Sequence, residues 1–443
     1  MNNATMYSTD NAGGIPYPET EKYAYDRWFT TTGLTDGSEY KTIRFNIRQD
    51  NLYLHWTNAY LEIHGQLVKK ADGAAYPTGS KITLIHNAIP HMFSNVKLTI
   101  GTQLVENVNQ PGHVSSMMYD VLYPRSKGKT DGLQFLWQPD TDTTTDDTNK
   151  GFTVRQQYII EAPHTKGTFK LRIPLMMFYG FMENFLALRG YPYEIELVRG
   201  PDYPAIFRDD AADEGKLVFK EFILDIPVID PSNSVLLESL KGIKDPQPYL
   251  YSFRNRHGMF APIPANIHDF QLTITTDSLV ERPQMILVGL QLNPTMDQKF
   301  NHALYSNQNV ETMYVKMNNE QYPTTLIKAN WTENDSGFFY ESQEHVRANY
   351  LQYPARYTEG NMMNPANFRD LYTIYCFDVT KGNYALGGNS IVSSLHIHFK
   401  DVTKAHLRVY VAWFSDRTIE FFTDGKPFNI KTMNHSGFMQ LAV

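Results

Sequence analysis

Several short stretches of this chain carry residue types that could do chemistry, and the first resembles part of a phosphate-binding loop. Residues 126–130 read Ser-Lys-Gly-Lys-Thr, which is how such a loop ends. The motif also requires an earlier glycine, and Tyr123 occupies its position. Because the backbone cannot wrap a phosphate without that glycine, we expect a solvated loop here and no nucleotide site.

A run of aspartates and threonines at residues 140–147 has the oxygen-rich composition that calcium prefers. An ordered calcium loop also needs a glycine turn and a glutamate at fixed spacing, and the run contains neither. Charge runs of this kind are usually solvated. We therefore expect an exposed loop, as part of a long polar insertion at residues 125–151.

Histidine and cysteine side chains give the remaining candidates for metal binding or nucleophilic chemistry. His396 and His398 lie two residues apart in a predicted strand, so they share a face, and His406 is expected across a turn. Neither a cysteine nor a carboxylate falls at the spacing of further zinc ligands. Cys376 is the one cysteine of the chain and lies in an apolar strand segment. Burial there raises the pKa of a thiol and keeps it inert.

All of these candidates favour structural roles over chemistry. The chain has no Gly-x-Ser-x-Gly turn of a serine hydrolase. Paired carboxylates are too common in a chain of 443 residues to identify a glycosidase. The sequence predicts a protein that is not an enzyme, with no catalytic residue, no bound cofactor and no metal site.

The elements around these residues follow one β-rich pattern that occurs twice, the second copy about 200 residues after the first. Residues 95–100 and 309–315 open a strand pair in each copy, and a helix-like segment follows. Residues 217–229 and 407–421 supply the closing strand. The order of elements is the same while the loop lengths differ, as expected of diverged tandem domains.

Alternation of polar and apolar residues, or apolar runs bounded by turns, predicts the individual strands. They are residues 41–47, 53–56, 60–67, 81–85, 95–100, 103–106, 157–161, 168–173, 193–198, 217–229, 269–275, 285–292, 312–317, 372–379, 394–400 and 407–414. Residues 112–122 and 342–351 are predicted helices, and in the second Glu344 can approach Arg347. Each half therefore offers about eight short strands, which predicts an all-β fold of two tandem antiparallel β-sandwiches with a few short helices. Periodicity alone cannot set the strand order, so a plain sandwich is better supported than a jelly roll at this point.

Changes in composition predict the domain boundaries. A short helix at residues 235–240 is expected inside a compact connector. The expected segments are an N-terminal arm (1–25), a first domain (26–230), a linker (231–248), a second domain (249–422) and a C-terminal tail (423–443).

Length and charge narrow the class of protein. A chain of 443 residues is too long for one hydrophobic core, which agrees with two domains. With 40 basic and 47 acidic residues the formal net charge is −7, which argues against a general nucleic-acid binder. The N-terminus has no basic and apolar signal segment, and the longest apolar run, residues 173–182, is too short and interrupted for a membrane span. We expect synthesis in the cytosol.

One stretch of the first half resembles a known family. Residues 169–175, Phe-Lys-Leu-Arg-Ile-Pro-Leu, lead through Gly180 and Phe181 to residues 193–198, Tyr-Glu-Ile-Glu-Leu-Val. Together with the duplicated organisation, this resembles the double jelly-roll major capsid proteins of Polinton-type elements and adintoviruses. The likeness spans residues 41–422, and its motifs are diffuse because this family has no catalytic signature.

The resemblance implies two jelly rolls side by side, with three chains forming a pseudo-hexameric trimer of an icosahedral shell. Long loops such as residues 125–151 would form the outer surface, and the arm and the tail would link neighbouring capsomers or face the interior. The implied partners are further copies of the chain, a penton protein and minor capsid proteins, with no membrane span and no sequence-specific nucleic acid. The implied location is the virion capsid, after synthesis in the host cytosol and assembly in the cytoplasm or nucleus.

Two other functions remain open from the residues alone. Trp28, Trp137 and Trp331 fall in loop-like regions, which would suit a glycan- or receptor-binding sandwich. A carbohydrate-active enzyme on a sandwich scaffold rests only on fold analogy. A stable trimer would separate the capsid hypothesis from both.

Overall fold

The structure is a computed structural model of the 443-residue chain. The residues that it describes are 6–7, 20–30, 39–48, 52–161, 166–184, 187–188, 190–231, 249–274, 282–292, 297–318, 320–351, 363–380, 393–421 and 431–432. The connector helix predicted at residues 235–240 lies outside them, as do most of the predicted arm and tail.

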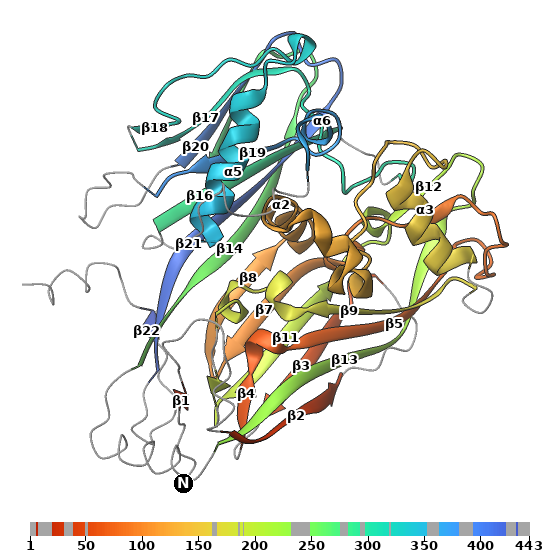
Figure 1. The fold of residues 1–443 in the computed structure, drawn as a ribbon, viewed down its shortest axis with the longest axis vertical. Coiled ribbons are helices and arrows are strands. Elements are labelled where there is room, and N and C mark those ends of the chain that lie inside the picture. Colours follow the sequence, from red (N-terminus) through yellow and green to blue (C-terminus); the bar gives the residue numbers. More distant parts are fainter. Residues whose placement is uncertain are drawn as a thin grey trace, which may run out of the picture.

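The first half folds into two facing antiparallel sheets, which we call the first sandwich (Figure 1). One sheet has the order β2-β13-β5-β9 and the other the order β3-β11-β7-β8. The strands are β2 (Thr20–Phe29), β3 (Thr42–Arg48), β5 (Tyr60–Lys69), β7 (Phe93–Ile100), β8 (Gln103–Asn109), β9 (Thr168–Pro174), β11 (Pro192–Arg199) and β13 (Gly215–Pro231). Short strands extend the first sheet or form a separate pair: β1 (Met6–Tyr7), β4 (Tyr53–His55) and β10 (Ala187–Leu188) in the sheet, and β6 (Ile82–Leu84) with β12 (Ile206–Arg208).

The second half repeats this arrangement as the second sandwich. Its sheets have the orders β14-β21-β16-β19 and β15-β20-β17-β18. The strands are β14 (Tyr249–Ile263), β15 (Asp269–Ile274), β16 (Arg282–Leu292), β17 (Val310–Met317), β18 (Glu320–Tyr322), β19 (Ile374–Asp378), β20 (Ser393–Phe399) and β21 (Leu407–Phe421), with β22 (Lys431–Thr432) added beside β21. If the eight shared strands of each half are numbered along the chain, both halves pair them as 1-8-3-6 and 2-7-4-5. This is the strand order of a jelly roll, which periodicity could not supply.

Alternating side chains explain why the predicted strands form with one wet face. In β3, Ile43, Phe45 and Ile47 are buried, while Arg44 points outward. On that outer face the guanidinium Nη2 of Arg44 lies 3.0 Å from a carboxylate oxygen of Glu196 on the neighbouring β11. Cross-strand ion pairs of this kind keep the exposed face soluble and hold the register.

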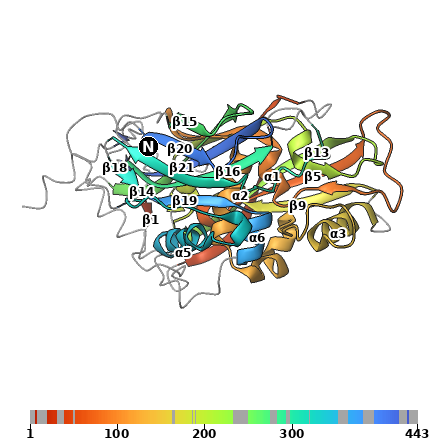
Figure 2. The same cartoon turned by 90° about the horizontal axis from the view of Figure 1, so that it is seen from above.

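Helices fill the connections between strands. α2 (Pro111–Leu122) and α5 (Gly337–Leu351) each follow the fifth strand of their half, which confirms both predicted helices. The Glu344 carboxylate lies 3.7 Å from the Arg347 guanidinium on α5, as expected. The other α-helices in the described part of the chain are α1 (Ala88–His91), α3 (Lys150–Gln156) and α6 (Pro365–Asp370). Seen from above, α3, α5 and α6 lie on one side of the molecule, with β15 and β20 toward the other (Figure 2).

Three predictions about elements were wrong or incomplete. Residues 157–161 form a π-helical turn and not a strand, because α3 continues into them and buries Ile159 and Ile160. Strand β2 begins at Thr20, inside the segment expected to be an arm. The long strand β14 was missed, because Asn255 and Arg256 in its centre are buried polar residues and break the alternation.

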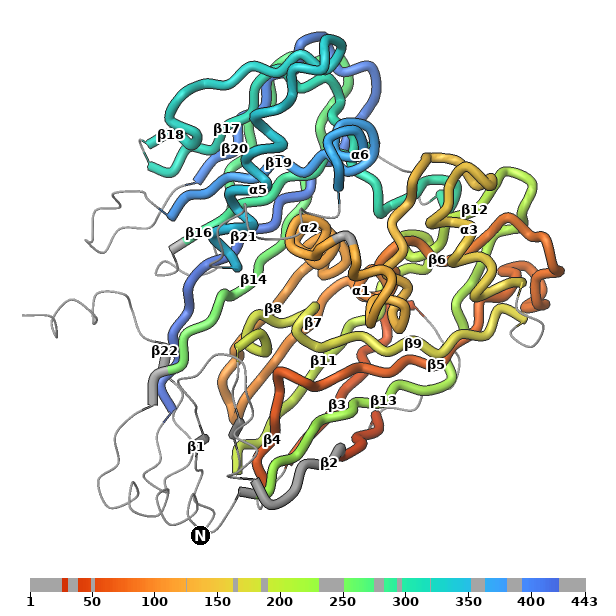
Figure 3. The backbone as a smooth tube through the Cα atoms, viewed as in Figure 1, coloured from red at the N-terminus to blue at the C-terminus, as the bar shows by residue number. Residues whose placement is uncertain are grey.

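The described residues form two hydrophobic cores, and one of them extends across both sandwiches. β21 has two buried faces: Val409 and Val411 belong to the core of the second sandwich, whereas Tyr410, Ala412 and Phe414 pack into the core that fills the first. β14 runs beside β21 along its whole length (Figure 3). Two sandwiches with separate interiors therefore share a wide apolar interface.

Among the described residues, no helix combines the length and the apolar character that crossing a membrane requires.

Candidate functional site

Buried side chains from both halves gather on the surface where the two sandwiches meet, which we call the inter-sandwich interface. It consists of α2 and nearby residues of the first sandwich on one side, and the sheet β14-β21-β16-β19 on the other (Figure 1). All twelve residues of α2 are buried. A helix that is buried on every side must be either apolar or fully satisfied by polar partners.

Polar side chains of α2 find partners within their own sandwich. The Asp120 carboxyl lies 3.0 Å from Nε2 of His86, and Ser116 is 3.0 Å from Nε2 of His91. Burial lowers the pKa of His86 to about 3 and raises the pKa of Asp120 well above its ordinary value. Both shifts favour the neutral forms, so burial opposes an ion pair between these two side chains.

Other α2 side chains reach the second sandwich. Nδ1 of His113 lies 2.9 Å from the hydroxyl of Tyr305, and its ring stacks on Tyr410 with a centroid distance of 3.5 Å. Nη2 of Arg256 donates to the hydroxyl of Tyr119 over 3.1 Å. These contacts add directional bonds to the apolar packing, which fixes how the helix sits against the sheet.

A buried glutamate forms a second link across the interface. The Glu106 carboxylate of β8 accepts hydrogen bonds from the backbone N–H groups of Gly180 (3.0 Å) and Phe181 (3.1 Å), and from that of Arg256 (3.1 Å) on β14. The Arg256 guanidinium also pairs with Glu183 over 2.7 Å. Burial raises the pKa of Glu106 to about 7, against the opposing effect of Arg256 and of the three N–H donors.

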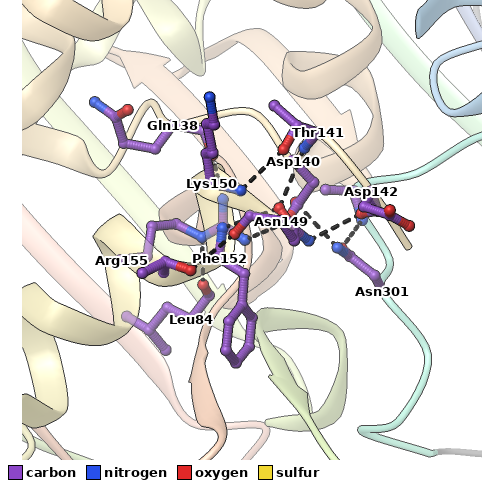
Figure 4. A network of polar contacts seen from close by, with 12 residues as sticks. Leu84, Gln138, Asp140, Thr141, Asp142, Asn149, Lys150, Phe152, Arg155 and Asn301 are labelled. Atoms are coloured by element: carbon purple, nitrogen blue, oxygen red, sulfur yellow. Dashed lines mark hydrogen bonds and ion pairs between the residues drawn. The ribbon is translucent and has the colours of Figure 1, made fainter. Parts of the chain in front are cut away.

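An aspartate forms the third link, drawn in Figure 4. The Asp140 carboxylate pairs with Nη2 of Arg155 (2.7 Å) and accepts from Nδ2 of Asn149 (2.8 Å) and of Asn301 (3.0 Å). Its backbone N–H donates to the hydroxyl of Tyr372 over 2.7 Å. Asn301 and Tyr372 belong to the second half, so this cluster ties the insertion of the first sandwich to the second.

The insertion at residues 125–151 therefore differs from the exposed loop that was predicted. Asp140 is completely buried, whereas Asp146 and Asp147 later in the same run are exposed, as expected. Trp137 has an exposed fraction of 0% because it packs against His86 and Tyr123. The prediction failed here because the apolar and polar partners of the insertion come from distant parts of the chain.

The other tryptophans are not binding platforms either. Trp331 is 7% exposed, and its indole N–H donates to the carbonyl of Val310 over 2.7 Å. Trp28 is half-buried and packs on the core of the first sandwich. The feature that suggested a glycan-binding surface is therefore absent at these three positions.

The predicted chemical candidates lie apart from one another. Residues 126–130 lie in and directly after a 3₁₀-helical turn and do not form a phosphate-binding loop. Lys127 pairs with Asp131 over 2.6 Å. Cys376 is buried, which raises the pKa of its thiol, and it faces the inter-sandwich interface.

The two histidines of β20 share a face as predicted, and each has a partner from a neighbouring strand. His396 stacks on Tyr314 at 4.8 Å. Nδ1 of His398 lies 2.7 Å from Asp269 and its Nε2 lies 3.3 Å from Glu311, carboxylates that sequence spacing could not bring together. Within the described part of the chain, no group of three or more histidine, cysteine, aspartate or glutamate side chains is arranged to hold a metal ion.

Sequence reasoning missed the residues that link the sandwiches: Glu106, Asp140 and Arg256. One signal was available for Glu106, a charged residue inside the apolar segment Leu-Val-Glu-Asn-Val. A charge in such a place is retained only when it has partners, but the sequence gives no indication of which residues they are.

Comparisons with known proteins agree with this fold. A chain in a cryo-EM structure of the Sputnik virophage matches with a TM-score of 0.59 and 11% identity over 96% of this chain and 91% of that one. VP54 of PBCV-1, fitted into a reconstruction of Sputnik, matches with a TM-score of 0.51 and 10% identity over 96% and 100%. A chain in a quasi-atomic model of the PBCV-1 virus capsid matches with a TM-score of 0.50 and 10% identity, over 96% of this chain and 100% of that one.

No curated protein sequence matches the chain. A family model described as "Double jelly roll-like domain" matches residues 147–419, which is more than half of the chain. That match and the strand order of the two sandwiches agree, and the chain belongs to the double jelly roll-like domain family.

Proposed function

We propose that this protein is a viral major capsid protein whose trimers form the pseudo-hexameric units of an icosahedral shell. The observation that carries the proposal is the presence, in one chain, of two jelly rolls with the same strand order. Membership of the double jelly roll-like family and the fold likeness to a chain of the PBCV-1 virus capsid model support it. The role is structural and not catalytic.

Geometry explains why duplication suits such a role. Three chains with two similar domains each present six similar edges, so a threefold unit can occupy a sixfold position in a closed shell. This works only if the two domains keep one orientation. The inter-sandwich interface supports that requirement, because apolar packing and the links of Glu106, His113 and Asp140 all cross it.

Native mass spectrometry of the purified chain, with electron microscopy of the same sample, tests the proposal. One chain has a mass of 51.0 kDa, so the expected species has three times that mass and appears as particles of hexagonal outline. A species of one chain mass at every concentration, without hexagonal particles, would contradict the proposal. Intact folding is checked on the same sample by circular dichroism.

The finer parts of the proposal concern partners, place and boundaries. Neighbouring capsomers, a penton protein and minor capsid proteins are the proposed partners, the virion capsid is the proposed location, and Polinton-type elements and adintoviruses are the proposed relatives. The proposed domains are 26–230, extended at its start by β2 from Thr20, and 249–422, with the rest of the arm and the tail making contacts between capsomers. Shell assembly from this protein, with and without a co-expressed single jelly-roll protein, tests the partner list.

A further inference from the structure

One cavity at the inter-sandwich interface has an unusual lining. It has a volume of about 110 Å³ and lies between the start of α2 and the strands β14 and β21, so both sandwiches contribute to it. Its lining includes His91 and His113 from the first sandwich, and His302 and Arg408 from the second. We call it the interface cavity.

The first turn of α2 contributes to the lining of the interface cavity. The first helical residue is Pro111, which has no N–H, and the preceding Gln110 makes no side-chain cap. The N–H of Val114 donates to the Gln110 carbonyl over 3.2 Å. First-turn N–H groups have no acceptor four residues back in their own helix, and Gly112 and His113 belong to this turn. Both residues line the cavity, where the helix dipole adds partial positive charge.

A second, independent observation comes from the side chain of His302. This residue is 1% exposed, and it lines the cavity. Within the described part of the chain, neither of its buried ring nitrogens has a partner in hydrogen-bonding geometry; burial lowers its pKa, and the nearby Asp297 backbone acts to raise it. Buried polar atoms are almost always satisfied in folded proteins, so an imidazole in this state beside a cavity indicates a ligand or water there.

The charge of the lining selects the kind of ligand. Arg408 is the one charged side chain among the described residues that line the interface cavity, and no carboxylate lines it. The buried Nε of Arg408 has no hydrogen-bond partner among the described residues, whereas its Nη1 donates to the hydroxyl of Tyr410 over 3.4 Å. A cation would meet a guanidinium and a helix N-terminus there, whereas an anion would satisfy both. The volume of about 110 Å³ admits a group of the size of phosphate.

We propose that the interface cavity binds a small oxyanion, of the class of inorganic phosphate or sulfate, between the N–H groups of α2, the imidazole of His302 and the guanidinium of Arg408. The bound anion bridges the two sandwiches, because α2 belongs to one and Arg408 to the other. When bound, it therefore stabilises the inter-sandwich interface, in addition to the links of Glu106 and Asp140. This site does not depend on the capsid role, since it lies inside a single chain.

Calorimetric titration of the full chain with inorganic phosphate, and then with sulfate, tests the proposal at constant ionic strength with chloride as the exchanged anion. Saturable binding with a stoichiometry of one per chain is expected, together with a rise in melting temperature that saturates with the same affinity. No saturable heat with either oxyanion, or the same heat with chloride alone, overturns the proposal.

Variants assign the binding to this cavity. Arg408→Gln removes the guanidinium, and His302→Phe keeps the ring volume while removing both nitrogens. Each is expected to weaken phosphate affinity by about tenfold or more, since each removes a hydrogen bond to a charged group. Lys404→Gln removes one exposed charge a few residues before Arg408 and should leave the affinity unchanged.

The comparison of variants also removes a known complication. Phosphate and sulfate stabilise folded proteins in general because they are excluded from the protein surface. That effect is equal in all four proteins, so only the difference between them reports the site. Equal affinity in the wild type and Arg408→Gln would overturn the proposal even if phosphate raised every melting temperature. The trimer measurement on the same samples is independent of this outcome.

Discussion

At the scale of single residues, Asp140 determines how firmly the insertion of the first sandwich is attached. It is buried with Arg155, and it also accepts from an asparagine of each half. A buried ion pair is weak evidence of net stabilisation, but removal of one partner leaves an uncompensated charge in a dry place. Two aspartates of the same acidic run, Asp140 and Asp147, should therefore differ in their effect on the free energy of unfolding.

Asp140→Ala is therefore expected to lower the free energy of unfolding by about 3–5 kcal/mol, because the Arg155 guanidinium loses its partner. Asp147→Ala, in the same run but exposed, should change it by less than about 0.5 kcal/mol. Urea denaturation followed by fluorescence measures both. Equal effects of the two substitutions would contradict the structural role of Asp140.

Buried histidines give the stability of the protein a definite pH dependence. Burial lowers the pKa of His86, His91 and His302 to about 3, whereas the unfolded value is near 6.5. The unfolded chain then binds more protons than the folded chain below about pH 6.5, so stability falls as the pH falls, by about 1.4 kcal/mol per pH unit for each histidine. Glu106 and Asp120 act in the opposite direction, because their raised pKa values favour the folded state at low pH. For Glu106 this contribution is lost as the pH rises from about 4.5 to about 7.

The histidines outnumber such buried acids, so we expect the urea midpoint to fall between pH 6.5 and pH 4. The fall should be steepest below about pH 4.5, where the opposing contribution of Glu106 no longer changes. His302→Phe should reduce the slope by about 1.4 kcal/mol per pH unit. A midpoint that stays constant or rises over this range, or an unchanged slope in the variant, would argue against neutral buried histidines.

At the scale of elements, α2 and α5 occupy equivalent positions in the two sandwiches but have different surroundings. α2 is enclosed on all sides, whereas α5 buries only part of its surface. The space around the glycine at the start of each helix differs in the same way. A Cβ at Gly112 would lie 2.5 Å from ring atoms of His91 and 2.7 Å from its Cα, whereas a Cβ at Gly337 would meet nothing within 4 Å.

Gly112→Ala is expected to destabilise the protein by about 1–3 kcal/mol, because the added methyl group forces α2 away from α1. Gly337→Ala should be neutral or stabilising by up to about 1 kcal/mol, since alanine has a higher helix propensity than glycine. Thermal unfolding monitored by circular dichroism compares the two variants directly. If both were tolerated equally, the close contact between α1 and α2 would not be a constraint on the fold.

The difference between one-sided and two-sided burial also explains which elements could be predicted from the sequence. Strands with one wet face, such as β3 and β11, alternate polar and apolar residues and were recognised. β14 was missed because its polar centre is buried between the sandwiches, where Arg256 finds its partners on β8, α2 and the loop that holds Glu183. The linking residues were missed because their partners are distant in sequence. Glu106 and Arg256, and likewise Asp140 and Asn301, lie 150 or more positions apart.

At the scale of the whole molecule, the orientation of the two sandwiches should control assembly. Ala412 is completely buried on the face of β21 that packs against the first half. Ala412→Glu places a charge there, which is costly without a partner. If assembly needs one fixed orientation, the variant should lose trimers in native mass spectrometry.

Two measurements separate loss of orientation from loss of folding. The far-ultraviolet circular dichroism of Ala412→Glu should keep its β-sheet signal, because the core of the second sandwich lies on the opposite face of β21. Val402→Glu, at a position that is 43% exposed, should change neither the signal nor the trimer. A trimer that survives in Ala412→Glu would mean that assembly does not depend on the inter-sandwich interface.

The two buried faces of β21 have a consequence for the independence of the second sandwich. A second sandwich separated from its neighbour would expose Tyr410, Ala412 and Phe414 to water as an apolar surface, and such a fragment would precipitate or associate with itself. A sandwich that folded alone would need polar residues at these positions of its last strand. The solubility of the second sandwich therefore depends on the first.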